Sequence, residues 1–470
     1  MENSAFIRAH DRVRQNNRIH SKSIAHFFVS VLIYAFIVIG LIQNNDNFIN
    51  FAVVCSCIYI LISNVSNSLL FLLGLTIFEN SFKIAGLLGW FFVVAVFVAK
   101  NVFVKSNFKQ NGLYKSLIAT VLLCSVSFFT DAISYGLEGQ IITTIILIVF
   151  FGVIFNLNDS KLSLSSGKMC IYIGASFICA IIYLLNQYGG LADFIKLFMN
   201  SPYAYRFGHS YGEIVGGSMG IPIYALMVIS FSLVAFLEER NQNIIQIIIM
   251  IVLDLVSIVF GALTISRSFY VGISIILVLF IFGRSKGPKI LLKKIAIIAL
   301  VCLLFFAVSK AYGSVVNQVF NNLFTRISAD ETSGGTGARV EIWNSCFKYL
   351  FDNPYGFIFG FGSNGYPQIG YANDLLFFAG AHNIFVDVLM SWGVIGFSLV
   401  LSIIHRYHPK NGYFELLKNK TIYLVPLITL IVFSMTAMRT NSFKTFIYLY
   451  CCFYIINSFD SEREKEGGLR

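Results

Sequence analysis

Charged residues are scarce in this sequence, since Asp, Glu, Lys and Arg make up 12% of its 470 residues. Soluble globular proteins carry about twice that share. Apolar residues reach 57%, which is enough for roughly thirteen spans of about 20 residues each. The composition excludes a water-soluble enzyme and predicts an all-α polytopic membrane protein with about 12–14 transmembrane helices.

Two further absences narrow the function. The nine cysteines include no C-x-x-C pair, and all but Cys346 lie in apolar stretches, so they indicate neither a metal site nor a disulfide framework. The net charge of +11 does not indicate nucleic-acid binding, which needs a basic face on a soluble fold. We therefore expect the basic residues to set the membrane topology.

The distribution of basic residues predicts that topology. Basic residues precede an apolar run from about Ile24 to Ile42, which is too long for a signal-peptide core, and we interpret it as the first span. The positive-inside rule then places both termini in the cytoplasm. We expect one membrane domain over 1–470, with two long connections on the outer side, at 188–218 and 313–382.

The second long connection contains an amphipathic pattern. Apolar residues recur at helical spacing over 338–351, with Trp343 on the apolar side and Asp352-Asn353-Pro354 ending the pattern. We interpret this segment as an interfacial helix at the membrane surface.

Several arginines lie on the expected outer side, where the topology rule disfavours them. A guanidinium group matches phosphate oxygens, so converging arginines would bind a lipid diphosphate; the alternative is that each one reaches lipid headgroups or pairs with a carboxylate. The outer arginines are Arg206, Arg267, Arg326, Arg339 and Arg439.

The sharpest pattern is His382-Asn383-x9-Gly393-x2-Gly396. On a continuous helix both glycines return close to the face of His382 and allow a neighbouring helix to approach. An imidazole suits proton transfer from a sugar hydroxyl, whereas the alternative is a loop histidine beside an Asn N-cap. Among the carboxylates, Asp254 lies within an apolar span, where it is either a functional group or the hydrogen-bond partner of another polar residue inside the bundle. Glu213 and Asp387 are weaker candidates for a general base.

These motifs carry a family resemblance. Together with Gly337-Ala338-Arg339-x3-Trp343 and Asn353-Pro354-x5-Gly360-x-Gly362, the His382 pattern resembles the signature of the O-antigen polymerase and O-antigen ligase superfamily. More loosely, Arg206-Phe207-Gly208 and Ser266-Arg267 are similar to its other arginine motifs. Arg206 is followed after ten residues by Gly217, as in some polymerases, but Arg339 is followed at that spacing by Leu350.

The resemblance implies a membrane glycosyltransferase of the C-type (GT-C) at the outer, periplasmic face of the bacterial inner membrane. Its substrate would be an oligosaccharide linked to undecaprenyl diphosphate, without a metal or other cofactor, and its partners would be membrane lipids, a chain-length regulator and a flippase. The implied residues are catalytic His382, Arg267 and Arg339, and substrate-binding Arg206, Asn383, Trp343 and Tyr366.

Among the activities open to such a protein, we favour an O-antigen polymerase, which transfers a growing glycan onto a lipid-linked repeat unit. An O-antigen ligase would use the same donor with lipid A core as the acceptor. A flippase or other transporter would also have many helices, but here the polar motifs gather at one surface, not at mid-membrane.

Overall fold

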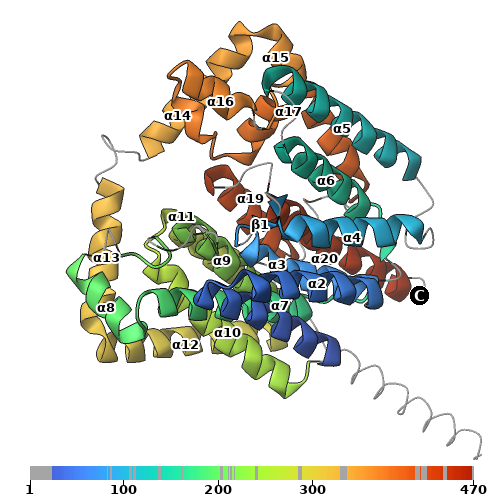
Figure 1. The fold of residues 1–470 in the computed structure, drawn as a ribbon. Helices are drawn as coiled ribbons and strands as arrows, with labels where there is room; N and C mark the ends of the chain where they lie inside the picture. The colour runs from blue at the N-terminus through green and yellow to red at the C-terminus, as the bar shows by residue number, and fades with distance from the viewer. Residues whose placement is uncertain are drawn as a thin grey trace, which may run out of the picture.

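The structure is a computed structural model that describes residues 24–81, 83–84, 87–104, 108, 113–135, 139–159, 162–201, 205–209, 211, 214–215, 217–238, 242–283, 288–328, 336–363, 365–407, 413, 416, 421–437 and 442–467. Helices dominate it, as the composition predicts (Figure 1). Within these residues, the one sheet is an antiparallel pair of two-residue strands, β1 (Lys83–Ile84) and β2 (Leu87–Leu88).

The first half of the chain consists mainly of apolar helices joined by short connections. Its helices are Ile24–Gln43, α2 (Asp46–Ile62), α3 (Val65–Leu75), η1 (Thr76–Phe78), α4 (Trp90–Phe103), α5 (Leu113–Tyr135), α6 (Gly139–Ile154), α7 (Ser166–Gln187), α8 (Leu191–Asn200) and α9 (Gly217–Glu238).

The second half continues the bundle and adds a group of shorter helices. Its helices are α10 (Ile244–Leu263), α11 (Arg267–Phe282), α12 (Pro288–Ala311), α13 (Gly313–Ser328), α14 (Thr336–Asp352), α15 (Pro354–Phe359), α16 (Gly365–Ala372), η4 (Leu376–Ala379), α17 (Ile384–Ile404), η5 (His405–Tyr407), η6 (Thr421–Leu424), α19 (Val425–Ala437) and α20 (Phe443–Gly467).

Length and hydropathy confirm a polytopic membrane protein. Within the described residues, the helices long and apolar enough to cross a membrane are Ile24–Gln43, Ser166–Gln187, Gly220–Leu237, Ile244–Leu263 and Ile384–Ile404. Shorter apolar helices, such as Trp90–Phe103 and Arg267–Phe282, lie beside them.

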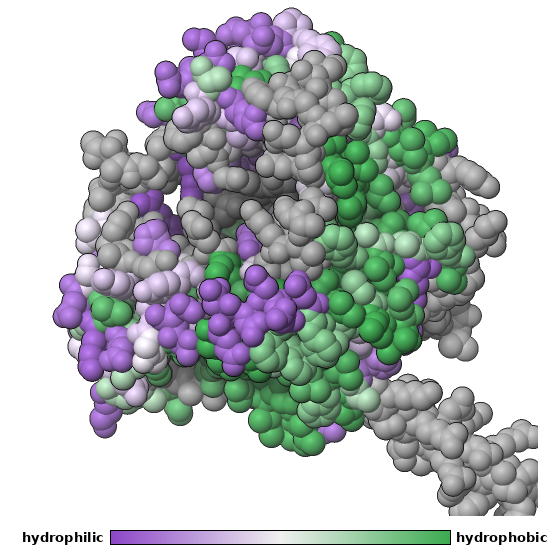
Figure 2. Space-filling model, viewed as in Figure 1, coloured by the Kyte–Doolittle hydropathy of each residue, from purple (hydrophilic) through white to green (hydrophobic). Residues whose placement is uncertain are grey.

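The centre of the bundle is α9, which packs against α7, α10 and α19. Its side chains are almost all buried, so a helix that is apolar on every side has protein around it. The first helix and α10 lie further out and expose large apolar side chains, including Phe28 (60% exposed) and Ile244 (64%). In a spanning helix such side chains face lipid, and Figure 2 shows apolar surface over much of the bundle.

The described residues of the connection expected at 313–382 are mostly helical. This connection contains α13 to α16 and η4, and Figure 1 shows α14, α15 and α16 as a layer beyond the main bundle. This layer shares a small apolar core with α17, in which Cys346, Tyr366 and Met390 of α17 are buried. The helix predicted at 338–351 is present as α14 (Thr336–Asp352), but its apolar side contacts this core. A position at the membrane surface stays a prediction.

Candidate functional site

The contacts of the described residues place the predicted site residues in two groups. One group lies where the segment 205–209 meets the turn between α10 and α11, and it contains Arg206 and Arg267. The other lies where α14 and α16 meet the start of α17, and it contains the remaining five predicted residues. The topology predicted from charge puts both groups on the outer side.

Arg206 is held beside the end of α10 by its neighbours in the chain. The Phe207 amide donates to the Leu263 carbonyl at 3.0 Å, and the rings of Phe207 and Phe260 are 4.8 Å apart. The Gly208 amide donates to the hydroxyl of Tyr188 at 3.2 Å. The Arg206 guanidinium lies 3.1 Å from Nδ1 of His209. The segment that carries Arg206 is therefore anchored four residues before Arg267.

Arg267 is the first residue of α11, and a constrained turn sets its position. Ile265 has φ +48°, a conformation that a β-branched residue adopts only where its surroundings enforce it. Thr264 stabilises the turn, because its hydroxyl donates to the Gly261 carbonyl at 2.6 Å and accepts from the Ser266 amide at 3.3 Å. The N-terminus of α11 adds partial positive charge beside the guanidinium, which favours an anion there.

In the second group, two aromatic side chains hold the peptide that precedes His382. The Trp343 indole N–H donates to the Ala381 carbonyl at 3.0 Å, and the Ala381 amide donates to the Tyr366 hydroxyl at 3.2 Å. His382 follows with φ +52°, in the left-handed region. The hydrogen bonds to the carbonyl and the amide of Ala381 thus hold the left-handed conformation of His382, which costs roughly 1–3 kcal/mol. Arg339 lies on α14, one turn before Trp343.

Tyr366 also connects this peptide to a buried carboxylate. Its hydroxyl donates a hydrogen bond to Asp387, whose side chain is buried (2% exposed) on the first turn of α17. Cys346 on α14 is close to this carboxylate: burial, and next the charge of Asp387, raises the pKa of the Cys346 thiol to about 12. Asp387, Tyr366 and Cys346 therefore form one buried cluster beneath the loop of His382.

Asn383 is the N-cap of α17. Its side-chain oxygen accepts from the amides of Phe385 at 3.0 Å and Val386 at 3.5 Å. The alternative interpretation of the motif, a loop histidine beside an Asn cap, thus describes the local geometry correctly. It does not exclude a role in chemistry, because a cap also fixes where the preceding residue points.

The continuous helix expected from His382 to Gly396 is wrong. Gly393 has φ +61° and ψ −166°, so α17 is interrupted at this glycine. A Cβ atom there would lie 2.5 Å from the carbonyl carbon of Ile358 and 2.6 Å from the amide nitrogen of Phe359. A close approach was expected at the glycines, and at Gly393 the backbone at the end of α15 is in close contact. The break in α17 was missed because side-chain periodicity does not detect a change in backbone conformation.

The remaining candidates are dispersed. Asp254 on α10 accepts a hydrogen bond of 2.6 Å from Ser232 on α9, as expected for an internal partner in a polar contact. Glu213 and Arg439 lie outside the described residues, and Arg326 lies on α13 with its side chain outside the description.

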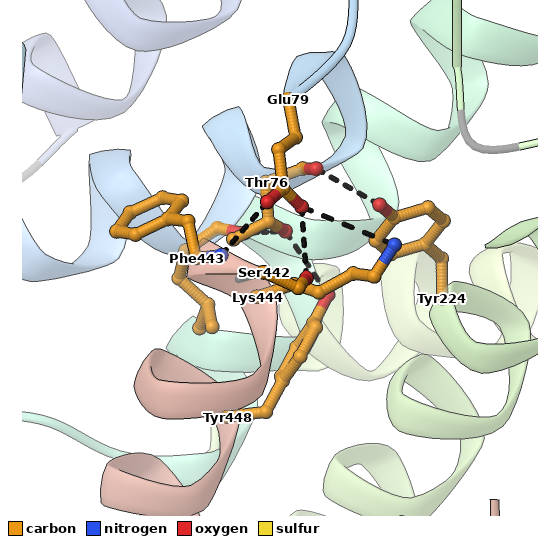
Figure 3. Close-up of polar contacts among 8 residues, drawn as sticks. Thr76, Glu79, Tyr224, Ser442, Phe443, Lys444 and Tyr448 are labelled. Carbon is orange, nitrogen blue, oxygen red and sulfur yellow. Dashed lines mark hydrogen bonds and ion pairs between the residues drawn. The ribbon is translucent and has the colours of Figure 1, made fainter. Parts of the chain in front are cut away.

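A second polar cluster, which the sequence reasoning missed, joins η1, α9 and α20 (Figure 3). Buried Glu79 accepts from the Phe443 amide at 2.7 Å and the Ser442 hydroxyl at 3.1 Å, and it lies 3.9 Å from the Lys444 amine. Tyr224 donates to the Thr76 carbonyl at 2.8 Å, and the hydroxyls of Thr76 and Tyr448 are 3.3 Å apart. The signal in the sequence was a single glutamate directly after an apolar run.

Comparisons with known proteins agree with the site motifs. Residues 252–401 match the family model for O-antigen ligase, a stretch that includes Arg267, Arg339 and His382 and leaves out Arg206. The chain is 23% identical over 350 residues, or 73% of its length, to the ComP-specific O-oligosaccharyltransferase of Acinetobacter baylyi. It spans 59% of that relative's length. No solved structure matches.

These matches confirm the resemblance to the O-antigen polymerase and ligase superfamily. The names of the family model and of the relative both describe glycan transfer.

Proposed function

We propose that this protein transfers an oligosaccharide from a polyprenyl diphosphate carrier to an acceptor hydroxyl at the outer face of the bacterial inner membrane. The observation that carries the proposal is the restrained peptide before His382, which Trp343 and Tyr366 anchor within the stretch that matches the ligase family. Constrained backbone of this kind clusters at active sites, which favours a role in chemistry for His382 over a space-filling one.

The proposed reaction is a single group transfer. The acceptor oxygen bonds to the anomeric carbon of the donor sugar while the bond between that carbon and the diphosphate oxygen breaks. The leaving lipid diphosphate keeps the electron pair, and His382 accepts the proton of the acceptor hydroxyl. Arg267 and Arg339, assisted by Arg206, stabilise the charge that develops on the diphosphate, which accelerates transfer only if they are preorganised.

For three residues, the contacts favour roles other than the substrate binding that the resemblance implied. Trp343, Tyr366 and Asn383 use their polar groups within the protein, to hold the Ala381 peptide and the first turn of α17. We therefore propose that they position His382 and do not bind the glycan directly. Asp387 supports Tyr366 and is too deeply buried to act as the base.

The acceptor distinguishes the finer activities. The polymerase predicted from the sequence would use a lipid-linked repeat unit, whereas the family match to O-antigen ligase favours another acceptor, such as lipid A core, as the second candidate. Both matches are to glycan-transferring proteins, which disfavours the flippase alternative. A flippase would still supply the donor on the outer side, and a chain-length regulator would act with a polymerase alone.

The test is a transfer assay with purified protein, undecaprenyl-diphosphate-linked oligosaccharide and either a second lipid-linked unit or lipid A core. Ladders without lipid A core indicate a polymerase, and a single addition to the core indicates a ligase. We expect His382→Ala to lower turnover by about 10²–10⁴-fold. Exposed His405, at the other end of α17, is the matched control, and His405→Ala should keep full activity.

Arginine is tested in the same assay. Arg267→Ala should lower turnover by about 10²–10³-fold, and Arg267→Lys should recover only part of it, because lysine lacks the planar fork. Normal turnover in both His382→Ala and Arg267→Ala would refute the proposed function.

A further inference from the structure

A groove of about 560 Å³ lies between α5 and α6, and none of the candidate site residues lines it. Its walls include Leu117, Val121, Cys124 and Phe128 of α5 and Ile145 and Val149 of α6. The lining hydroxyls of Thr120 and Ser125 donate to carbonyls of their own helix, at 2.8 Å and 3.0 Å. The groove therefore presents an apolar surface, in the part of the molecule where Figure 2 shows apolar side chains over α5 and α6.

The groove follows the length of α5. From Leu117 to Phe129, the lining covers about 18 Å at the helical rise of about 1.5 Å per residue, more than half of a hydrocarbon core of about 30 Å. The predicted topology has α5 running outward, so Phe129 marks the end nearer the outer surface. An apolar chain lying along α5 would match the length and the chemistry of this lining.

The outer end of the groove lies below the turn Gly360–Ser363. The Ser363 hydroxyl is 3.2 Å from that of Thr144 on α6 and 3.5 Å from the Asp131 carboxylate on α5. The turn is thereby inserted between the two helices at this level. Further down, the helices are in close contact, because a Cβ atom at Gly152 would lie 2.9 Å from Cβ of Thr120.

The same turn is bonded to the helix that follows His382. The Phe361 amide donates to the Met390 carbonyl at 2.8 Å, and the Gly362 amide donates to the Ser391 carbonyl at 2.9 Å. Asp131 lies three residues after Phe128 and faces the same side of α5 to within about 60°. The groove therefore leads directly to the folded connection that contains the candidate site.

We propose that this groove binds the polyprenyl chain of the lipid diphosphate donor, with the diphosphate beyond the turn Gly360–Ser363. The inference rests on the proposed function, which requires a donor with a long apolar chain and a polar head at the outer surface. The turn contacts both helices of the groove and also α17, and this link to the candidate site favours the donor chain over bilayer lipid, whose binding needs no such link.

The binding test uses a photoreactive polyprenyl diphosphate with wild-type protein in nanodiscs. We expect label on peptides of α5 and α6, reduced at least tenfold by excess undecaprenyl diphosphate and unchanged by excess phosphatidylglycerol. Equal reduction by phosphatidylglycerol would identify ordinary bilayer lipid in the groove and overturn the proposal. Labelling should persist in His382→Ala, which separates binding in the groove from the proposed chemistry.

The kinetic test uses a variant in which a larger side chain fills the groove. Val121 lines it and neighbouring Leu122 does not, although both side chains are exposed, by 63% and 48%. We expect Val121→Trp to raise KM for a long-chain donor about tenfold at constant kcat, and to leave a donor with two isoprene units unaffected; such a change corresponds to about 1.4 kcal/mol. Leu122→Trp should change neither value. Equal kinetics for the two variants would contradict the proposal even if transfer itself is confirmed.

Discussion

Tyr366→Phe tests the support of His382 by removing one hydroxyl from a buried site. This hydroxyl accepts from the Ala381 amide at 3.2 Å and donates to Asp387, and both partners are buried. Leaving a buried polar group unsatisfied costs about 1–3 kcal/mol, so two such groups cost about 2–6 kcal/mol in this loop. The aromatic ring stays, and the packing around Phe377 is retained.

The loss should appear in the rate of transfer. If only about 2 kcal/mol of it raises the reaction barrier, turnover falls about 30-fold. Because the hydroxyl contacts protein in place of substrate, we expect a lower kcat with little change in the KM for the donor. The assay is transfer by purified protein in nanodiscs.

Two controls make the result specific. Tyr371 on the same helix is 78% exposed, and Tyr371→Phe should retain full turnover. In a double-mutant cycle, Tyr366→Phe and Asp387→Ala should be non-additive, because each removes the hydrogen bond between the two side chains. Full turnover in Tyr366→Phe, or additive losses in the cycle, would refute the idea that this contact positions His382.

Two other substitutions test the architecture around the site. Gly393→Ala should lower the free energy of unfolding by about 2–6 kcal/mol, because the new Cβ is strained at this left-handed position and contacts the Ile358 backbone. It should also accelerate hydrogen exchange in α15. Gly313→Ala is the control, because a Cβ at Gly313 has open space around it. Unchanged exchange would contradict the described backbone contact. Glu79→Ala should destabilise the protein by about 3–5 kcal/mol, because it leaves the partly buried Lys444 without its carboxylate. Thermal unfolding in detergent measures this, with Asp46→Ala at an exposed position as the control, and equal midpoints for the two variants would contradict it.

Hydropathy and helix signals predicted the elements well. The expected first span at 24–42 is the helix Ile24–Gln43, and the expected amphipathic segment at 338–351 is α14. Both signals depend on local periodicity and on Asn or Pro at a boundary, which a sequence displays directly. The N-cap at Asn383 was visible for the same reason.

Tertiary contacts were not predictable in this way. Periodicity assigned Trp343 to an apolar face and gave no sign that its indole N–H reaches a carbonyl 38 residues away. The break at Gly393 depends on a backbone conformation that the hydrophobic pattern does not encode. Glu79 acquires its role only because α20 begins beside it, in a part of the chain more than 360 residues distant.

The proposed transfer requires cationic side chains from the two groups to act on one lipid diphosphate. The most direct measurement is a cryo-electron microscopy map of the protein in nanodiscs with a bound, unreactive analogue of the donor. We expect diphosphate density in contact with Arg267 and Arg339, and His382 facing the anomeric carbon. Density bound at the other membrane face, or in contact with neither arginine, would contradict the account.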